Sequence, residues 1–497
     1  MKLLDRIDHS PPFRAAAFFF FSFVFQSICS VYNTPLNPYY GYDSAFFLLI
    51  GKGIVAGKIP YLDLYDQKGP MVFYINALGY LLTGDRMGVF LLQVVFFAAS
   101  LLMLYRIVRC FLDIKRCWMA MGLFCLLYIG TVKDGDMTEE WSLLFSLIPM
   151  VLAVGFLRRE IPVKAHPFGY SVVYGICTGI LVLFRVTNAA LLAGLIFGFS
   201  MLLLRKKAFL ALGKNALGVM FGFFVVAAPV CLYFIHLGAF DSFIYASLLH
   251  NFSYAVDGAS SKSPVEWGAI IVSVAFFLLT AAAAPRMARD KITSPGIITL
   301  ASCISLTGSF AMTLGYGYRH YFLIVVPAIT LDYCLWLTWL DGTENKMVRF
   351  RRWAAAVLTA LVLLPYVPQM VRQGGKVVYN DILRTPESEK LRYEALNQYV
   401  PRGSDSVWGY NVRAKDYLYM GVLPCYRYFA EQEWMMEANP SIRGELEEYL
   451  TQDGPEWIFL GSSETEMLEW LTVELGYTFP EGFNTDSSVL LLQKQNG

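Results

Sequence analysis

The side chains that could do chemistry gather first in a stretch near the N-terminus. Residues 37–70 contain the carboxylates Asp43, Asp63 and Asp66, and Lys68 follows closely. A carboxylate can remove a proton from an attacking hydroxyl, and a cation can hold an anionic group and stabilise the charge that develops as it leaves. The segment therefore predicts a site where a hydroxyl attacks a substrate with an anionic leaving group.

Further polar side chains lie beside other apolar runs, where ionisable groups are costly and by default functional. They are Asp136, Glu139, Arg185, Arg319, His320 and Tyr321. Simpler explanations exist, since carboxylates cap helices or favour helix N-termini, and aromatic and basic residues anchor helices at the membrane surface. We interpret the six residues, together with Asp63, Asp66 and Lys68, as candidate substrate-binding residues.

The composition predicts a membrane protein. The chain has 497 residues, of which 56% are hydrophobic and 16% are charged. A soluble protein of this length could not bury so much apolar surface. The net charge is +1 and no basic or acidic tail is present, so nucleic acid is not an expected partner. The nine cysteines form no CxxC pair, and neither a disulfide framework nor a zinc site is indicated.

Apolar runs of sufficient length predict about eleven spanning helices. They cover residues 13–31, 87–105, 117–132, 141–157, 168–184, 188–204, 211–235, 265–284, 296–314, 321–340 and 353–369. The run Met71–Leu82 is too short to cross, because a helix rises roughly 1.5 Å per residue. We expect it and Ser44–Ala56 to be helices that lie on the membrane surface within the loop 32–86.

The distribution of lysine and arginine predicts the orientation. With Met71–Leu82 outside the membrane, most basic residues fall in loops on the side of the N-terminus. The positive-inside rule then places the N-terminus in the cytoplasm and the loop 32–86 on the extracytoplasmic face of the cell membrane.

The last part of the chain has a different composition. We expect residues 1–370 to form the transmembrane domain and residues 371–497 a small extracytoplasmic α/β domain. Short strands are predicted at Ser406–Tyr410, Trp457–Leu460 and Ser488–Gln493, with helices at Glu387–Tyr399 and Ser441–Thr451 between them.

Several motifs resemble those of one family of membrane enzymes. They are Tyr42-Asp43-Ser44, Gly57-Lys58-Ile59-Pro60-Tyr61-Leu62-Asp63, Asp66-Gln67-Lys68-Gly69-Pro70, Met137-Thr138-Glu139-Glu140 and Tyr318-Arg319-His320-Tyr321. The chain resembles the protein mannosyltransferase and aminoarabinose transferase superfamily, which has the GT-C fold, over its first ten predicted spans. Many members carry Asp-Glu where this chain has Asp43-Ser44, so a second carboxylate is missing at that point.

The resemblance implies an inverting glycosyltransferase. The donor would be a sugar on a polyprenyl phosphate, and the acceptor a glycan, protein or lipid outside the cytoplasm. Asp43 would be the catalytic base, whereas Lys68, Arg185, Arg319 and His320 are candidates on chemical grounds for holding the phosphate. The loop carboxylates could also hold a divalent metal ion.

Two other functions compete with this one. A transporter or flippase of a lipid-linked saccharide would carry ionisable residues inside its spans, and here only Asp332 stands out. A structural or sensory protein would depend on its outer domain. The absence of GxGxxG and Walker motifs argues against a nucleotide-sugar enzyme.

Overall fold

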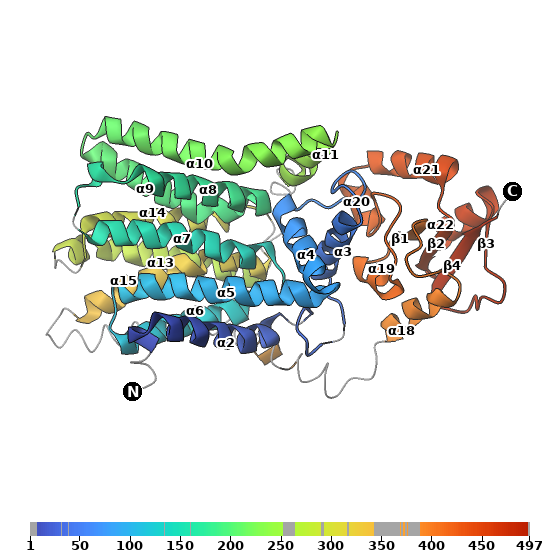
Figure 1. Cartoon of the computed structure of the whole chain (residues 1–497), viewed down its shortest axis with the longest axis horizontal. Coiled ribbons are helices and arrows are strands. Elements are labelled where there is room, and N and C mark those ends of the chain that lie inside the picture. Colours follow the sequence, from blue (N-terminus) through green and yellow to red (C-terminus); the bar gives the residue numbers. More distant parts are fainter. Residues whose placement is uncertain are drawn as a thin grey trace.

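Apolar helices form the N-terminal part of the chain and a small mixed sheet forms the C-terminal part (Figure 1). The computed structural model describes residues 7–341, 368, 371–372, 375 and 388–495, apart from residues 31, 38, 134, 160, 252–263, 290–292 and 316–317. The expected span 353–369 and the expected domain boundary at residues 370–371 fall largely outside the described residues.

The long helices run side by side and form a helical bundle (Figure 1). They are α2 (Pro11–Cys29), α5 (Arg86–Arg109), α6 (Ile114–Thr131), α7 (Thr138–Arg158), α8 (Phe168–Phe184), α9 (Ala190–Arg205), α10 (Phe209–His236), α13 (Pro264–Arg289), α14 (Pro295–Ala311) and α15 (Val326–Asp341). Each of these helices overlaps one expected span, so the polytopic helical fold is confirmed.

Fewer helices reach the length needed to cross a membrane than the apolar runs predict. Among the described residues, eight helical segments are long and apolar enough to cross a membrane. Helices α8 and α14 match two further expected spans but have 17 residues each. At 1.5 Å per residue they reach roughly 26 Å, slightly less than the thickness of the hydrocarbon core.

Glycines let some of these helices approach closely. Helices α8 and α10 pack through Gly175 and Gly222, where an added Cβ would collide with the carbonyls of Val219 and Val172. Such close packing of small residues replaces the hydrophobic driving force that is missing between helices in lipid.

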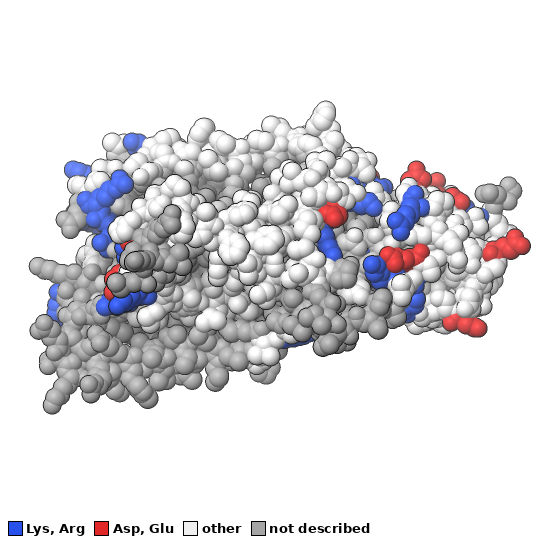
Figure 2. Space-filling model, turned by 60° about the horizontal axis from the view of Figure 1, so that its bottom comes forward, with Lys and Arg blue, Asp and Glu red and all other residues white. Residues whose placement is uncertain are grey.

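The ends of the long helices are strongly basic on one side. The last turns of α5, α7, α9 and α13 carry arginines: Arg106, Arg109, Arg158, Arg205, Arg286 and Arg289. Figure 2 shows basic side chains gathered at the end of the helical part farthest from the C-terminal domain. The positive-inside rule predicts that this end faces the cytoplasm.

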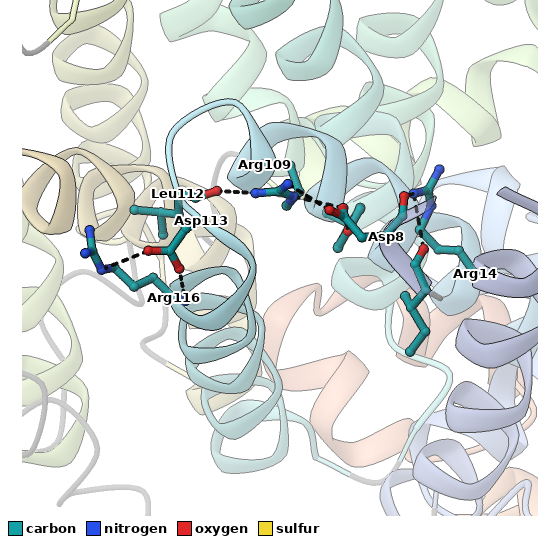
Figure 3. A network of polar contacts seen from close by, with 8 residues as sticks. Asp8, Arg14, Arg109, Leu112, Asp113 and Arg116 are labelled. Carbon is teal, nitrogen blue, oxygen red and sulfur yellow. Dashed lines mark hydrogen bonds and ion pairs between the residues drawn. The ribbon is translucent and has the colours of Figure 1, made fainter. Parts of the chain in front are cut away.

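A network of ion pairs and hydrogen bonds joins chain segments at the basic end of the helical part (Figure 3). The Arg109 guanidinium lies 2.9 Å from the Asp8 carboxylate and donates to the Leu112 carbonyl at 2.6 Å. Asp113 caps α6 by accepting from the Arg116 backbone N–H at 3.0 Å. The contacts tie the segment before α2 to the turn between α5 and α6.

The two short helices expected in the first loop are present at the opposite end. They are α3 (Asp43–Val55) and α4 (Pro70–Thr83), which lie between the long helices and the C-terminal domain (Figure 1). They touch where an added Cβ on Gly51 would collide with the backbone of Asn76 and Ala77. Arg86 holds the chain before α3, since it donates to the carbonyls of Tyr32, Asn37 and Tyr39.

The C-terminal domain contains a four-stranded sheet in the order β1-β2-β4-β3. The strands are β1 (Val407–Tyr410), β2 (Trp457–Gly461), β3 (Tyr477–Thr478) and β4 (Val489–Lys494), and only the β1–β2 pair is parallel. Its helices are α18 (Ser388–Ala395), α19 (Ala414–Met420), α20 (Gln432–Ala438), α21 (Ser441–Asp453) and α22 (Thr465–Glu469). The expected strands and helices, and hence the α/β class, are confirmed.

This domain packs on the first loop. The Tyr65 N–H donates to the Arg427 carbonyl at 3.0 Å, and the rings of Phe46 and Phe429 lie 5.4 Å apart. Helices α3 and α4 and the domain share one hydrophobic core, which places residues 427–435 next to the start of α3.

Candidate active site

A cavity of about 410 Å³ lies where four parts of the chain meet. The first loop, the segment from residue 133 to the start of α7, the 3₁₀ helix Arg319–Val325 and the C-terminal domain all contribute to its wall. Its ionisable and aromatic lining residues include Asp43, Asp66, Lys68, Lys133, Glu139, His320, Tyr321, Glu431 and Trp434. Six of the ten residues singled out in the sequence therefore line one cavity.

Asp43 is the first residue of α3, where the helix dipole favours a negative charge. Its carboxylate lies 2.7 Å from the Lys133 ammonium. Burial opposes ionisation, but the positive charge and hydrogen bond of Lys133 and the charge of Lys68 outweigh it, and the pKa of Asp43 is lowered. The carboxylate is therefore ionised at neutral pH and able to accept a proton.

The segment that carries Asp66 and Lys68 is fixed by backbone contacts. The Tyr61 hydroxyl donates to the Lys68 carbonyl at 2.8 Å, and the Asn251 amide donates to the Gln67 carbonyl at 2.8 Å. Burial raises the pKa of Asp66, although the nearby charge of Lys68 opposes this effect.

Arg185 supports the cavity wall from behind. It follows α8 directly, and its guanidinium lies 3.5 Å from the Glu139 carboxylate and 3.8 Å from the centre of the Tyr321 ring. Both partners line the cavity, whereas Arg185 does not. The His320 and Tyr321 rings meet edge to face at 4.6 Å.

Besides Arg185, three predicted residues lie apart from the cavity lining. Asp63 accepts a hydrogen bond from the Ile59 N–H at 2.7 Å and so closes a local turn. Asp136 is buried beneath the wall, where Trp141 and Asn76 donate to it at 2.8 and 3.2 Å. Arg319 precedes His320 but is exposed and does not line the cavity.

Other lining residues were not singled out from the sequence. Lys133 begins the polar run KDGDMTEE directly after an apolar helix, so its position gave a usable signal. Glu431, Trp434 and Met435 belong to α20 and the residue before it. Nothing local in the sequence predicts that these residues fold back onto the first loop.

A second cavity of about 410 Å³ is almost wholly apolar. It lies between α4, α8, α10 and the short helix α11 (Phe240–Ile244), and its wall includes Pro70, Leu183 and Phe224. Pro70 is two residues from Lys68, and Leu183 is two residues from Arg185. One lining residue of the apolar cavity, Pro70, is therefore close along the chain to Lys68 of the polar cavity.

Possible metal ligands do not cluster in the described part of the chain. No group of three or more His, Cys, Asp or Glu side chains is arranged there to hold a metal ion.

The sequence matches no protein-family model and no curated protein. Among solved structures, it is similar to ArnT from Cupriavidus metallidurans bound to undecaprenyl phosphate, with a TM-score of 0.58, 13% identity, and coverage of 97% of this chain and 98% of that one. It is also similar to the apo oligosaccharyltransferase from Archaeoglobus fulgidus, with a TM-score of 0.50, 12% identity, and coverage of 90% and 70%. The chain thus has the fold of these membrane glycosyltransferases, the GT-C fold that the sequence resemblance implied.

Proposed function

We propose that this protein is an inverting membrane glycosyltransferase. It moves a sugar, a hexose or a pentose, from a polyprenyl-phosphate carrier to a hydroxyl of a glycan, protein or lipid. The observation on which the proposal depends is the polar cavity in which Asp43 lies with the lysines Lys68 and Lys133. An apolar cavity has Pro70, two residues from Lys68, in its wall.

The two cavities suit the two ends of a lipid-linked donor. The apolar cavity would hold part of the polyprenyl chain, because its wall offers hydrocarbon and aromatic surface. The phosphate would lie at Lys68 and His320 in the polar cavity, with Arg185 contributing positive charge from behind Tyr321. The similar ArnT structure contains undecaprenyl phosphate, which supports this class of donor.

Asp43 would act as the base in a single displacement. The acceptor oxygen forms a bond to the anomeric carbon while the bond from that carbon to the phosphate oxygen breaks. The electron pair leaves with the phosphate, whose negative charge the cations stabilise, and the acceptor proton passes to Asp43. One displacement inverts the anomeric carbon, unlike the two-step retaining route.

The reaction would take place outside the cytoplasm. The arginine-rich ends of the long helices lie at the end of the helical part farthest from the C-terminal domain (Figure 2), and that domain forms part of the cavity wall. By the positive-inside rule this basic end faces the cytoplasm, so that the cavity and the C-terminal domain face outward.

Donor binding tests the proposal. Undecaprenyl phosphate is titrated into the full chain in lipid nanodiscs, and radiolabelled undecaprenyl-phosphate sugars are then supplied with envelope membranes as the source of acceptor. We expect saturable binding, sugar transfer, and binding about tenfold weaker or more in Lys68→Ala, since one charged contact to the phosphate is lost.

Lys58→Ala is the matched control, because Lys58 belongs to the same loop but does not line the polar cavity. Wild-type protein that neither binds the lipid nor consumes any of the donors would refute the proposed function. Equal loss of binding in the two variants would remove Lys68 from the phosphate site.

A further inference from the structure

The C-terminal domain contributes a wall of the polar cavity whose chemistry differs from that of the helical side. Glu431, Trp434 and Met435 line it. Trp434, on α20, is 43% exposed, whereas Trp408 and Trp457, on the strands of this domain, are 0% and 6% exposed. A large aromatic side chain left accessible within a cavity is a feature of ligand sites rather than of a packed core.

The backbone holds Glu431 in a conformation that is unfavourable for a residue with a side chain. Its φ is +53°, and its N–H donates to the Val412 carbonyl at 3.1 Å. The next residue, Gln432, is buried and donates to the carbonyls of Gly409 and Tyr428, both at 2.8 Å. A residue keeps an unfavourable backbone conformation only when surrounding contacts hold it there. These hydrogen bonds therefore fix the backbone of Glu431 at a defined point of the cavity wall.

The Glu431 carboxylate lacks a partner within the described part of the chain. No hydrogen bond or ion pair of its oxygens is found among those residues, and burial raises the pKa of Glu431 to about 7. Because the carboxylate is open to the cavity, a ligand hydroxyl there can donate a hydrogen bond to it.

We propose that Glu431 and Trp434 form the acceptor subsite of the transferase and bind a saccharide. The face of the Trp434 ring would pack against the apolar face of a sugar ring, and Glu431 would accept a hydrogen bond from a sugar hydroxyl. Met435 adds an adaptable apolar contact beside them.

The position of these residues favours the acceptor over the donor sugar as the group they bind. The apolar cavity and Lys68 belong to the helical part and the first loop, where a lipid-linked donor would enter from the membrane. Glu431 and Trp434 belong to the C-terminal domain, which lies outside the layer of long helices (Figure 1). The assignment of the bound saccharide as the acceptor rests on the proposed function. The inference that Glu431 and Trp434 bind a saccharide rests only on the geometry of these residues.

Saccharide binding without any lipid donor tests the subsite. The full chain in lipid nanodiscs is titrated with maltose, cellobiose, chitobiose and mannobiose, and binding is followed by saturation-transfer NMR. We expect at least one disaccharide to bind, with affinity reduced about tenfold in Trp434→Ala by loss of the aromatic contact. Glu431→Gln should also weaken binding, and Trp434→Phe should retain part of it.

Glu433→Gln is the matched control, because Glu433 is exposed on the same helix and does not line the cavity. Undecaprenyl phosphate binding, measured in the same nanodiscs, reports on the folding of each variant and on the proposed function. The inference is overturned if no disaccharide binds to the wild type, or if the wild type and Trp434→Ala bind equally. Failure to bind undecaprenyl phosphate would instead count against the proposed function alone.

Discussion

Asp43 and Lys133 form the closest ion pair in the lining of the polar cavity that the structure describes, although 90 residues separate them in the sequence. A base must be ionised before it can accept a proton. Without Lys133, burial would dominate the environment of Asp43 and favour the neutral acid. The lysine therefore keeps the carboxylate ionised, as the proposed role of Asp43 as base requires.

The Lys133→Met variant tests this relation. Loss of the Lys133 ammonium raises the pKa of Asp43. As the solution is acidified, the variant should therefore lose activity at a higher pH than the wild type does. An opposite charge at this distance shifts a pKa by about 1–3 units, and we expect a displacement of the acid limb of that size. The measurement is kcat/KM for sugar transfer between pH 4 and pH 8.

Two controls accompany Lys133→Met. Lys133→Arg keeps the positive charge and should retain most of the wild-type profile. Lys115→Met removes an exposed lysine from the basic end of α6 and should leave the profile unchanged. An acid limb that stays in place in Lys133→Met would show that Lys133 does not control the ionisation of the base.

The turn before α4 shows how secondary-structure elements position Lys68, the lysine proposed to bind the phosphate. The Gly69 N–H donates to the Phe184 carbonyl at the end of α8 at 3.2 Å, and an added Cβ on Gly69 would collide with the Leu183 carbonyl. Lys68 therefore depends on a close approach of two backbones that only glycine permits.

We expect Gly69→Ala to move this turn away from α8. The cost of the added methyl group should be about 1–3 kcal/mol of stability, and undecaprenyl phosphate should bind more weakly because Lys68 is displaced. Thermal unfolding and lipid titration in nanodiscs measure the two effects. Gly122→Ala in α6, where an added Cβ meets nothing within 4 Å, is the control; equal behaviour of the two variants would contradict this view of the turn.

The secondary structure could largely be predicted because its signals are local. The short apolar runs Ser406–Tyr410, Trp457–Leu460 and Ser488–Gln493 predict strands, and the structure has β1, β2 and β4 there. The short length of Met71–Leu82 likewise predicted a helix unable to cross the membrane, and α4 has 14 residues. Span counting was less secure where an apolar helix is close to the minimum length, as in α8 and α14.

The site could be predicted only in part because its walls come from distant segments. Charged residues beside apolar runs pointed to Asp43, Lys68 and His320, since such residues are costly near a membrane. Glu431 and Trp434 carry no such signal, because in a domain outside the bilayer charged and aromatic residues are ordinary. Their role emerges only from the packing of that domain on α3 and the first loop.

The orientation of the whole molecule leads to a labelling prediction. Glu447→Cys places an exposed thiol on α21 of the C-terminal domain, and Lys115→Cys places one at the basic end of α6. A membrane-impermeant thiol reagent added to intact cells should label the first variant above the wild-type background and leave the second unlabelled until the cells are opened. The reverse pattern would place the cavity in the cytoplasm.

The transfer step itself is tested by Asp43→Asn, which keeps the size of the side chain and removes its ability to accept a proton. Asp85→Asn in the same loop is the control, because Asp85 caps α5 by accepting from the Met87 N–H at 2.8 Å and asparagine caps equally well. The single-turnover rate of sugar transfer from an undecaprenyl-phosphate sugar should fall about 100-fold or more in Asp43→Asn, with lipid binding retained, and stay at the wild-type level in Asp85→Asn. Wild-type transfer by a folded, lipid-binding Asp43→Asn protein would show that this carboxylate is not the base.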